Sequence, residues 1–121
     1  MRKLAASAVV ALSLGGAVAT AIPAQAEHFD GRCNIGEICL YEHINSGGAV
    51  ADFASDVHDY TIWVFYGTRT NLNDNVSSAW NNTNFGVVYL YEHIHQNGRT
   101  IASIGAQTSR NVEDNVASSH D

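Results

Sequence analysis

Short apolar runs separated by polar turn residues set the pattern of this chain. β-Branched and aromatic side chains concentrate in Ile38–Tyr41, Ile62–Tyr66 and Val87–Tyr91, and Gly, Asn, Asp or Ser bounds each run. Such runs are typical of strands, and no segment carries the i, i+3, i+4, i+7 apolar stripe of an amphipathic helix. Gly47-Gly48 and Asn97-Gly98 mark tight turns. The pattern predicts an all-β sandwich or barrel.

An internal duplication organises these elements. The sequence LYEHI at Leu40–Ile44 recurs unchanged at Leu90–Ile94, and Asp74–Val76 recurs at Asp114–Val116. Two related halves predict two four-stranded Greek-key motifs packed face to face as a β-sandwich. The predicted domain spans residues 27–121, with one motif at about residues 33–80 and the other at about residues 85–121.

The N-terminal segment Met1–Ala26 is predicted to be an export signal. Arg2 and Lys3 precede a long charge-free run, and Ala24-Gln25-Ala26 offers the small-x-small pattern that signal peptidases cleave. The alternative is a membrane anchor, because the run of about 18 residues approaches the shortest span. The cleavage site and the polar Glu27 favour a cleaved signal. We therefore expect a secreted, extracellular protein with no membrane contact after cleavage.

Composition and charge narrow the class of protein. Apolar residues make up 45% of the 121 residues and charged residues 15%, and the formal net charge is -6. This mixture supports a packed core and argues against disorder. Loss of Arg2 and Lys3 with the signal would leave four Arg against twelve acids, a charge of -8 without any lysine. The acidic balance argues against nucleic acid as a partner.

The two cysteines, Cys33 and Cys39, are separated by five residues. In an oxidising compartment, cysteines so close together are expected to form a disulfide, whose role would be to hold the start of the first strand. A pair of catalytic thiols is the alternative, but the spacing is not C-x-x-C and no basic activator lies nearby.

The segments Tyr41–Gly48 and Tyr91–Gly98 resemble the Greek-key signature of βγ-crystallins. In that signature an aromatic residue starts a folded hairpin, and a glycine seven positions later takes a strained backbone conformation. A second aromatic usually stands two positions before the glycine, where this chain has Ser46 and Gln96. The resemblance implies a βγ-crystallin-like β-sandwich built from the two duplicated motifs.

The segment Asn73–Ser78 fits the calcium motif of microbial βγ-crystallins, N/D-N/D-x-x-S/T-S, at every defined position. The duplicate Glu113–Ser118 departs from it at Glu113 and Ala117, while a frame shifted by one residue, Asp114–Ser119, fits but breaks the alignment between copies. We keep the aligned frame here and expect a stronger and a weaker Ca²⁺ site. The alternative is a pair of polar loops that only cap turns. The ligands implied are Asn73, Asp74, Asn75, Ser77 and Ser78, with Glu92 and Glu42, and for the weaker site Asp114, Asn115 and Ser118.

The whole domain is also similar to a family of secreted actinobacterial peptidase inhibitors that includes crystallin-like metalloproteinase inhibitors. The shared features are the export signal, the C-x5-C pair leading into Leu40–Glu42, and Asn73–Ser78 running on into Trp80–Thr83. The resemblance implies a monomeric, non-enzymatic inhibitor of an extracellular peptidase. The alternative is a calcium-stabilised module with a toxin or stress-protective role, since crystallin-like toxins share the framework.

The first motif is ten residues longer than the second, and the surplus lies between Asp52 and Asn71. Loops on a rigid scaffold commonly carry function, so this segment is a candidate for peptidase contact, although the contact residues are not assigned. Its aromatic side chains, and Trp80, are expected either to fill the core or to form a protein-binding face. The aromatic residues concerned are Trp63, Phe65, Tyr66 and Trp80.

No pattern of catalytic residues accompanies these features. His93 and His95 alternate, so on a strand they would share a face, but no third ligand has the spacing of a zinc site. G-x-S-x-G and H-E-x-x-H motifs are missing from the sequence. We therefore expect exposed structural histidines and no enzyme activity.

Overall fold

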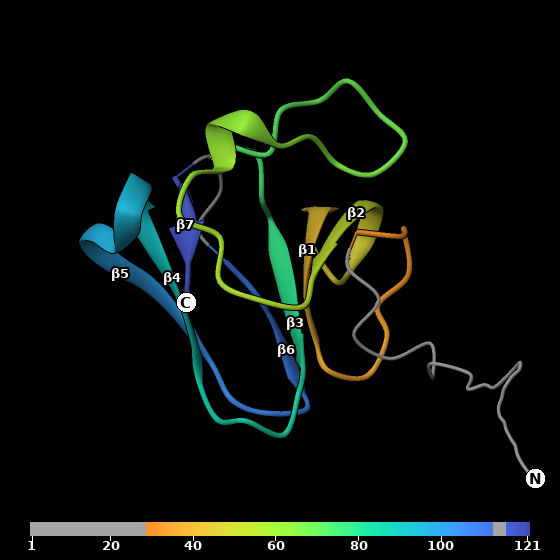
Figure 1. The fold of residues 1–121 in the computed structure, drawn as a ribbon, viewed down its shortest axis with the longest axis vertical. Helices are drawn as coiled ribbons and strands as arrows, with labels where there is room; N and C mark the ends of the chain where they lie inside the picture. The colour runs from red at the N-terminus through yellow and green to blue at the C-terminus, as the bar shows by residue number, and fades with distance from the viewer. Residues whose placement is uncertain (1–28, 113–115) are drawn as a thin grey trace, which may run out of the picture.

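The computed structural model describes residues 29–112 and 116–121, and these residues form two antiparallel β-sheets (Figure 1). One sheet has the strand order β2-β1-β3-β6 and the other β5-β4-β7. The predicted all-β class is confirmed, and the only helical elements described are two short 3-10 turns, η1 and η2. The bounds are β1 Glu37–His43, β2 Gly47–Phe53, η1 Tyr60–Ile62, β3 Ser78–Asn82, β4 Val88–His93, η2 Ile94–Gln96, β5 Asn97–Ile104, β6 Thr108–Asn111 and β7 Ser119–His120.

The predicted export signal lies outside the described residues. Within the described part of the chain, no helix has the length and apolar character needed to cross a membrane.

The two motifs exchange an element, which gives the Greek-key connection. Strand β6 of the second motif pairs with β3 of the first, so that Ser78 lies opposite Asn111. In return, Val57 of the first motif forms a single bridge with His120 of the second. The predicted four strands per Greek-key motif hold for the first sheet, whereas the second sheet has three strands and this bridge. The polar segment Ala54–Asp56 and the N-capping Asp59 leave too little extended chain around Val57 for a full strand.

The hairpins β1–β2 and β4–β5 are irregular at the same place, and β4–β5 has one further register shift between Leu90 and Tyr91. Each ends on a histidine opposite the strand that follows the turn, His43 with Gly47 and His93 with Asn97, and each shows a register shift just before it. Gly48 and Gly98 have φ of 73° and 79°. This left-handed conformation favours glycine, as the βγ-crystallin resemblance implies.

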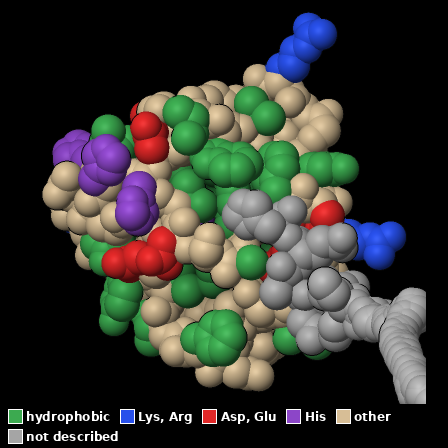
Figure 2. Space-filling view, in the orientation of Figure 1, with side chains coloured by type: hydrophobic (Ala, Val, Ile, Leu, Met, Phe, Trp, Pro, Cys, Tyr) green, Lys and Arg blue, Asp and Glu red, His purple; other side chains and the backbone are tan. Residues whose placement is uncertain are grey.

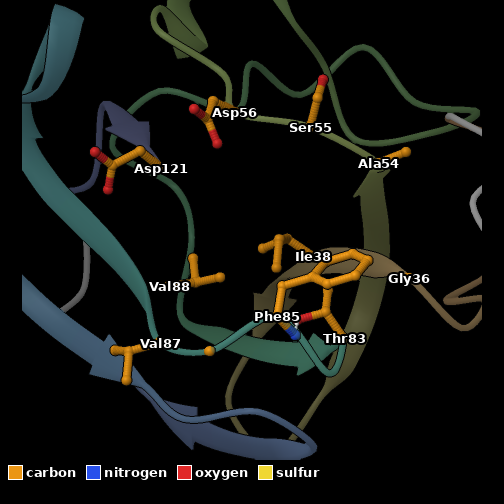
Figure 3. A pocket seen from close by; sticks show the side chains of 11 residues that line it. Gly36, Ile38, Ala54, Ser55, Asp56, Thr83, Phe85, Val87, Val88 and Asp121 are labelled. Atoms are coloured by element: carbon orange, nitrogen blue, oxygen red, sulfur yellow. Dashed lines mark hydrogen bonds between the residues drawn. The ribbon is translucent and has the colours of Figure 1, made fainter.

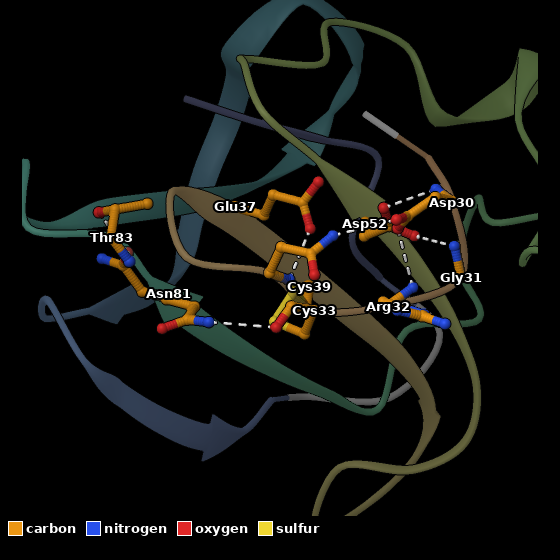
Figure 4. Close-up of a disulfide and its surroundings, with 11 residues drawn as sticks. Asp30, Gly31, Arg32, Cys33, Glu37, Cys39, Asp52, Asn81 and Thr83 are labelled. Atoms are coloured by element: carbon orange, nitrogen blue, oxygen red, sulfur yellow. Dashed lines mark hydrogen bonds between the residues drawn. A yellow bond between two sulfur atoms is a disulfide. The ribbon is translucent and has the colours of Figure 1, made fainter. Parts of the chain in front are cut away.

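The core lies between the sheets. Strand β1 contributes Ile38 and Leu40, while β4 contributes Val88 and Leu90, and all four are buried. The alternation places Glu37, Cys39 and Tyr41 on the opposite face of β1. The N-terminal residues cover that face, because Cys33 forms the predicted disulfide with Cys39. This disulfide holds the segment before β1 against the strand (Figure 4).

The predicted strand Ile62–Tyr66 is not present. Ile62 ends the turn η1, and only Val64 is bridged, to Asn71. The Asn71 side chain donates hydrogen bonds to the carbonyls of Thr61 and Trp63, at 3.0 and 3.1 Å. These bonds use backbone acceptors that a regular strand would need. The β-branched and aromatic composition instead serves packing in an irregular loop.

The aromatic residues of this loop mostly pack inward, as one of the two interpretations expected. Phe65 is fully buried, and Trp63 packs edge-on against Phe53 with ring centroids 4.9 Å apart. Tyr66 is 46% exposed, although its ring contacts that of Phe29. Trp80 is half-buried in β3.

Candidate functional site

Two serines define how the calcium-type motifs correspond. Ser78 pairs with Tyr41, and its hydroxyl donates to the His43 carbonyl at 2.6 Å. Ser119 pairs with Tyr91 in the same way, and its hydroxyl donates to the His93 carbonyl at 2.7 Å. The structural counterpart of Ser78 is therefore Ser119 and not Ser118.

In this register the second motif aligns with the first in the shifted frame, Asp114–Ser119, and not in the frame Glu113–Ser118 that we kept from the sequence. Ala117 becomes the counterpart of the buried Val76, and both residues are fully buried in the core. Ser118 becomes the counterpart of Ser77, since both backbone amides donate to the carbonyl of the motif's tyrosine, Tyr91 or Tyr41, at 2.9 Å. Ala117 thus does not replace a hydroxyl ligand, and Ser118 takes that position.

Asp74 from the first motif reaches across to the second. Its amide donates to the Ala117 carbonyl at 2.9 Å, and the Ser118 hydroxyl lies 3.4 Å from its Oδ1. Glu92, from β4, lines the same cleft. The cleft is lined by Thr61, Asn73, Asp74, Glu92, His93, Ile94, Val116 and Ser118.

The donor set of this cleft fits a cation that prefers oxygen ligands. Carboxylate and hydroxyl groups of Asp74, Glu92 and Ser118 line the cleft, and those of Asp74 and Ser118 lie 3.4 Å apart. Asn73 adds a side-chain oxygen, Oδ1, that is buried and has no hydrogen-bond partner. Buried polar atoms are almost always partnered, so this orphaned oxygen is able to accept a ligand contact. Asp74 also has a φ of 60°, which is uncommon outside glycine.

Charge around Glu92 keeps its carboxylate ionised. The backbone amide of Arg99 donates a hydrogen bond to Glu92 and, with the charge of the Arg99 guanidinium, lowers the pKa of the Glu92 carboxyl below its ordinary value. The Arg99 guanidinium lies 3.5 Å from Glu92 Oε2. A cation in the cleft would therefore share Glu92 with Arg99.

The other predicted ligands are not brought to this cleft. Ser78 is buried and uses its hydroxyl to hold the β1–β2 hairpin, and the Asn75 amide group donates to the Asn71 carbonyl at 2.8 Å. Glu42 lies on the pseudo-equivalent side, where its Oε1 accepts from the Ala49 amide at 3.4 Å. Ser77 is half-buried beside Tyr41 and belongs with Glu42 by register. The remaining predicted ligands of that second site, Asp114 and Asn115, lie outside the described residues.

A second feature of the surface is the connection of residues 83–87 between β3 and β4. Phe85 at its centre is 88% exposed, while the flanking Thr83 is buried. Asn81 holds both sides of the connection: its Nδ2 donates to the Gly86 carbonyl at 2.8 Å, and its Oδ1 accepts from the Thr83 amide at 3.1 Å. The Thr83 hydroxyl in turn accepts from the Phe85 amide at 3.2 Å. The connection is therefore a rigid loop that displays one large apolar side chain.

A shallow hollow lies directly behind this loop (Figure 3). Phe85, Val87 and Val88 line one side of it, and Ser55 and Asp56 lie across from them. Its volume is about 170 Å³, which is enough for one or two side chains of a partner.

Comparison with known proteins identifies a family for this chain. The model of the family described as peptidase inhibitor family I36 matches residues 26–103. The chain belongs to peptidase inhibitor family I36. Curated proteins offer no match to this I36 chain.

Solved structures match the fold of the I36 protein. One, from work on the evolution of the eye-lens βγ-crystallin domain fold, is 21% identical with a TM-score of 0.56, covering 71% of this chain and 83% of its own. Another, a βγ-crystallin from an archaeon, is 30% identical with a TM-score of 0.52, covering 72% of this chain and 96% of its own. The predicted βγ-crystallin-like sandwich is confirmed.

The histidines of the I36 protein do not form the arrangement that their spacing suggested. His93 ends β4, whereas His95 lies in η2 with a φ of 59°, so the two do not share a strand face. Figure 2 shows histidine side chains gathered at the end formed by β4, β5 and η2, where the rings of His58 and His95 are 6.3 Å apart. Among the described residues, no group of three metal-ligand side chains includes a histidine.

Two features of the I36 protein were missed by the sequence interpretation. One is the loop of Phe85, whose only signal is a lone aromatic in the polar run Asn81–Gly86. The other is a carboxyl cluster formed by Asp30, Glu37 and Asp52. Nothing in the spacing of those three acids pointed to it, because they come together only through the disulfide and the β1–β2 pairing.

Proposed function

We propose that this protein is a secreted inhibitor of an extracellular peptidase and that the connection of residues 83–87 is the segment that enters the peptidase cleft. Membership of the I36 family supports the class of activity. The observation that carries the assignment of the segment is the exposure of Phe85, at 88%, on a loop whose backbone is held from both sides by Asn81. An exposed phenylalanine suits a peptidase pocket that selects large apolar side chains.

Rigidity is what would separate such an inhibitor from a substrate. A loop already fixed in its bound conformation loses little conformational entropy on binding. The Asn81 side chain is buried and also donates to the Ile104 carbonyl at 2.9 Å, which ties the loop to β5 of the other sheet. If the peptidase cut the loop, these bonds would keep both new ends in place and favour rejoining or slow release.

A peptidase panel tests this assignment. We expect inhibition of a thermolysin-like metallopeptidase or a subtilisin-like serine peptidase, and we expect Phe85→Ala to weaken it at least tenfold, since buried aromatic anchors dominate interface energies. Ile62→Ala is the matched control, because Ile62 is 76% exposed on the long loop of the first motif. Equal inhibition by wild type and Phe85→Ala, or loss in Ile62→Ala instead, would reject the segment. Degradation of the wild type as an ordinary substrate would reject inhibition itself.

We also propose that the cleft of Asp74, Glu92 and Ser118 binds Ca²⁺. The orphaned Asn73 Oδ1 and the hydroxyl of Ser118, 3.4 Å from Asp74, support this assignment, because Ca²⁺ takes six to eight oxygen ligands. The residues of the chain would supply the negative charge and part of the shell, and water would complete it. The ion would join the two motifs and so raise the stability of the fold.

Thermal melting with Ca²⁺ and with chelator tests the calcium site. We expect a higher midpoint with Ca²⁺ for the wild type and a smaller rise for Ser118→Ala, with Ser109→Ala as the control because Ser109 is exposed on β6. Identical midpoints with Ca²⁺ and chelator would reject the proposal. A calcium response without inhibition of any peptidase would favour the alternative, a calcium-stabilised extracellular module with a toxin or stress-protective role.

Secretion is the remaining part of the proposal. The predicted signal ends at Ala26, and the disulfide of Cys33 and Cys39 fits an oxidising compartment. N-terminal sequencing of protein recovered from culture medium should begin at Glu27. Retention of the full chain in cells would reject it.

A further inference from the structure

Three carboxyl groups meet on the outer face of the first sheet, away from the cleft of Asp74 (Figure 4). Glu37 begins β1 and Asp52 lies in β2 opposite Cys39, so both project toward the segment that the disulfide holds. Asp30 belongs to that segment. One oxygen of each side chain lies within 4.8 Å of the others, and both Glu37 and Asp52 are 0% exposed.

The hydrogen bonds of the cluster organise these carboxylates without neutralising them. Asp52 accepts from the backbone amides of Asp30 and Gly31, both at 2.8 Å. Glu37 Oε1 accepts from the Asn34 amide at 2.8 Å. The other oxygen, Glu37 Oε2, is buried and has no hydrogen-bond partner. A buried carboxylate oxygen without a partner is costly, so its retention points to something that it binds.

Glu37 and Asp52 are fully buried, and among the described residues no ion pair involves either of them. Buried charged side chains are normally paired or coordinate a metal ion. A cation would therefore offset the charge of these two carboxylates.

We propose that Asp30, Glu37 and Asp52 form a divalent-cation site, with Glu37 Oε2 as one of its ligands. This site is separate from the cleft of Asp74 and does not depend on peptidase inhibition. Its donors are all oxygens, since Cys33 and Cys39 are paired, and this excludes the nitrogen and sulfur donors that zinc prefers.

The oxygens of the cluster, one from each side chain and all within 4.8 Å of one another, lie close enough to contact a single ion. Oxygen ligands of Ca²⁺, at about 2.3–2.6 Å from the ion, lie up to about 5 Å apart. Calcium is therefore a suitable ion for this cluster. A bound ion would fasten the disulfide loop to both β1 and β2.

Calcium titration in a background that lacks the other site tests the proposal. The parent is the full chain with Asp74→Asn, and the test variant adds Glu37→Gln, which keeps the shape of the side chain and lets its amide donate to Asp52. We expect the parent to bind Ca²⁺ by calorimetry and to melt at a higher temperature with Ca²⁺ than with chelator. We expect the double variant to bind at least tenfold more weakly and to show little calcium-dependent shift.

Folding of the variant is checked separately. In chelator the double variant should melt no lower than its parent, because the substituted amide carries no charge and can donate a hydrogen bond to Asp52. If it does not fold, Asp30→Asn in the same background, at a half-buried position, should also lose at least tenfold in affinity. Equal Ca²⁺ binding by parent and variants, or no binding by the parent, would overturn the site and leave a carboxyl group that holds a proton. Inhibition of peptidases, measured on the same variants, should not change.

Discussion

Tyr60 and His120 form a fully buried hydrogen bond between the first motif and the last strand. The Tyr60 hydroxyl lies 2.8 Å from His120 Nδ1, and His120 Nε2 lies 3.1 Å from the Ser55 carbonyl. A carbonyl only accepts, so Nε2 carries the proton and the neutral Nδ1 accepts from Tyr60. The long loop of the first motif is thereby anchored to β7, where the bridge between Val57 and His120 stands in for a fourth strand.

Removal of this hydrogen bond should destabilise the fold. Tyr60→Phe keeps the ring but leaves His120 Nδ1 buried without a donor, which typically costs about 1–3 kcal/mol. Urea denaturation measures the loss. The control Tyr89→Phe changes a ring that is 40% exposed in β4 and should shift stability by less than about 0.5 kcal/mol. Equal effects of the two substitutions would contradict the importance of the buried bond.

The same histidine should make the protein sensitive to acid. Burial lowers the pKa of His120 from 6.5 to about 4. Between these values the unfolded chain binds the proton and the folded chain does not, so stability falls as the pH drops from 6.5 toward 4. The loss from this group is about 3 kcal/mol.

Urea denaturation at several pH values between 4 and 7 measures this dependence. His120→Gln should be less stable than the wild type near pH 7, yet lose less stability on acidification because the titrating group is gone. Carboxyl groups contribute equally in both proteins, and the difference between the two curves isolates His120. Parallel curves would show that His120 does not titrate in this range.

The hairpin glycines should tolerate no side chain. A Cβ on Gly48 or Gly98 would lie 2.6 Å from Cδ2 of His43 or His93, whereas a Cβ on Gly67, with a φ of 73°, would have no atom within 4 Å. Gly67→Ala measures the cost of the left-handed backbone alone, about 1–2 kcal/mol. Gly48→Ala and Gly98→Ala should lower the free energy of unfolding further, because the added Cβ must also displace the histidine ring. Equal losses at all three positions would mean that the ring moves freely.

Asn81 should decide whether the exposed loop inhibits or is digested. Asn81→Ala leaves the Gly86 and Ile104 carbonyls without their donor and frees the backbone around Phe85. We expect a loss of about 2–4 kcal/mol in the free energy of unfolding. We also expect weaker inhibition and faster cleavage within residues 83–87, which mass spectrometry would detect. Asn97→Ala, at an exposed position, should alter none of these. Unchanged inhibition by a folded Asn81→Ala variant would show that the loop does not need this support.

The long loop shows where propensity misled the prediction. The run Ile62–Tyr66 has the composition of a strand, but Phe65 fills the core and Asn71 takes two backbone carbonyls of the loop. Side-chain hydrogen bonds of this kind compete with a strand ladder. The alternation of His93 and His95 failed for a related reason, since β4 ends between them.

Local features of the sequence determined the all-β class, the duplicated hairpins that end at Gly48 and Gly98, and the disulfide. These depend on residues close together in the chain, where turn geometry and spacing act directly. Tertiary structure alone decided that Ser119 corresponds to Ser78, that Asp74 meets Ser118, and which oxygens are buried without partners. Those relationships arise from pairing and burial between segments distant in sequence. The sequence offered both frames for the second motif, and only the strand pairing decided between them.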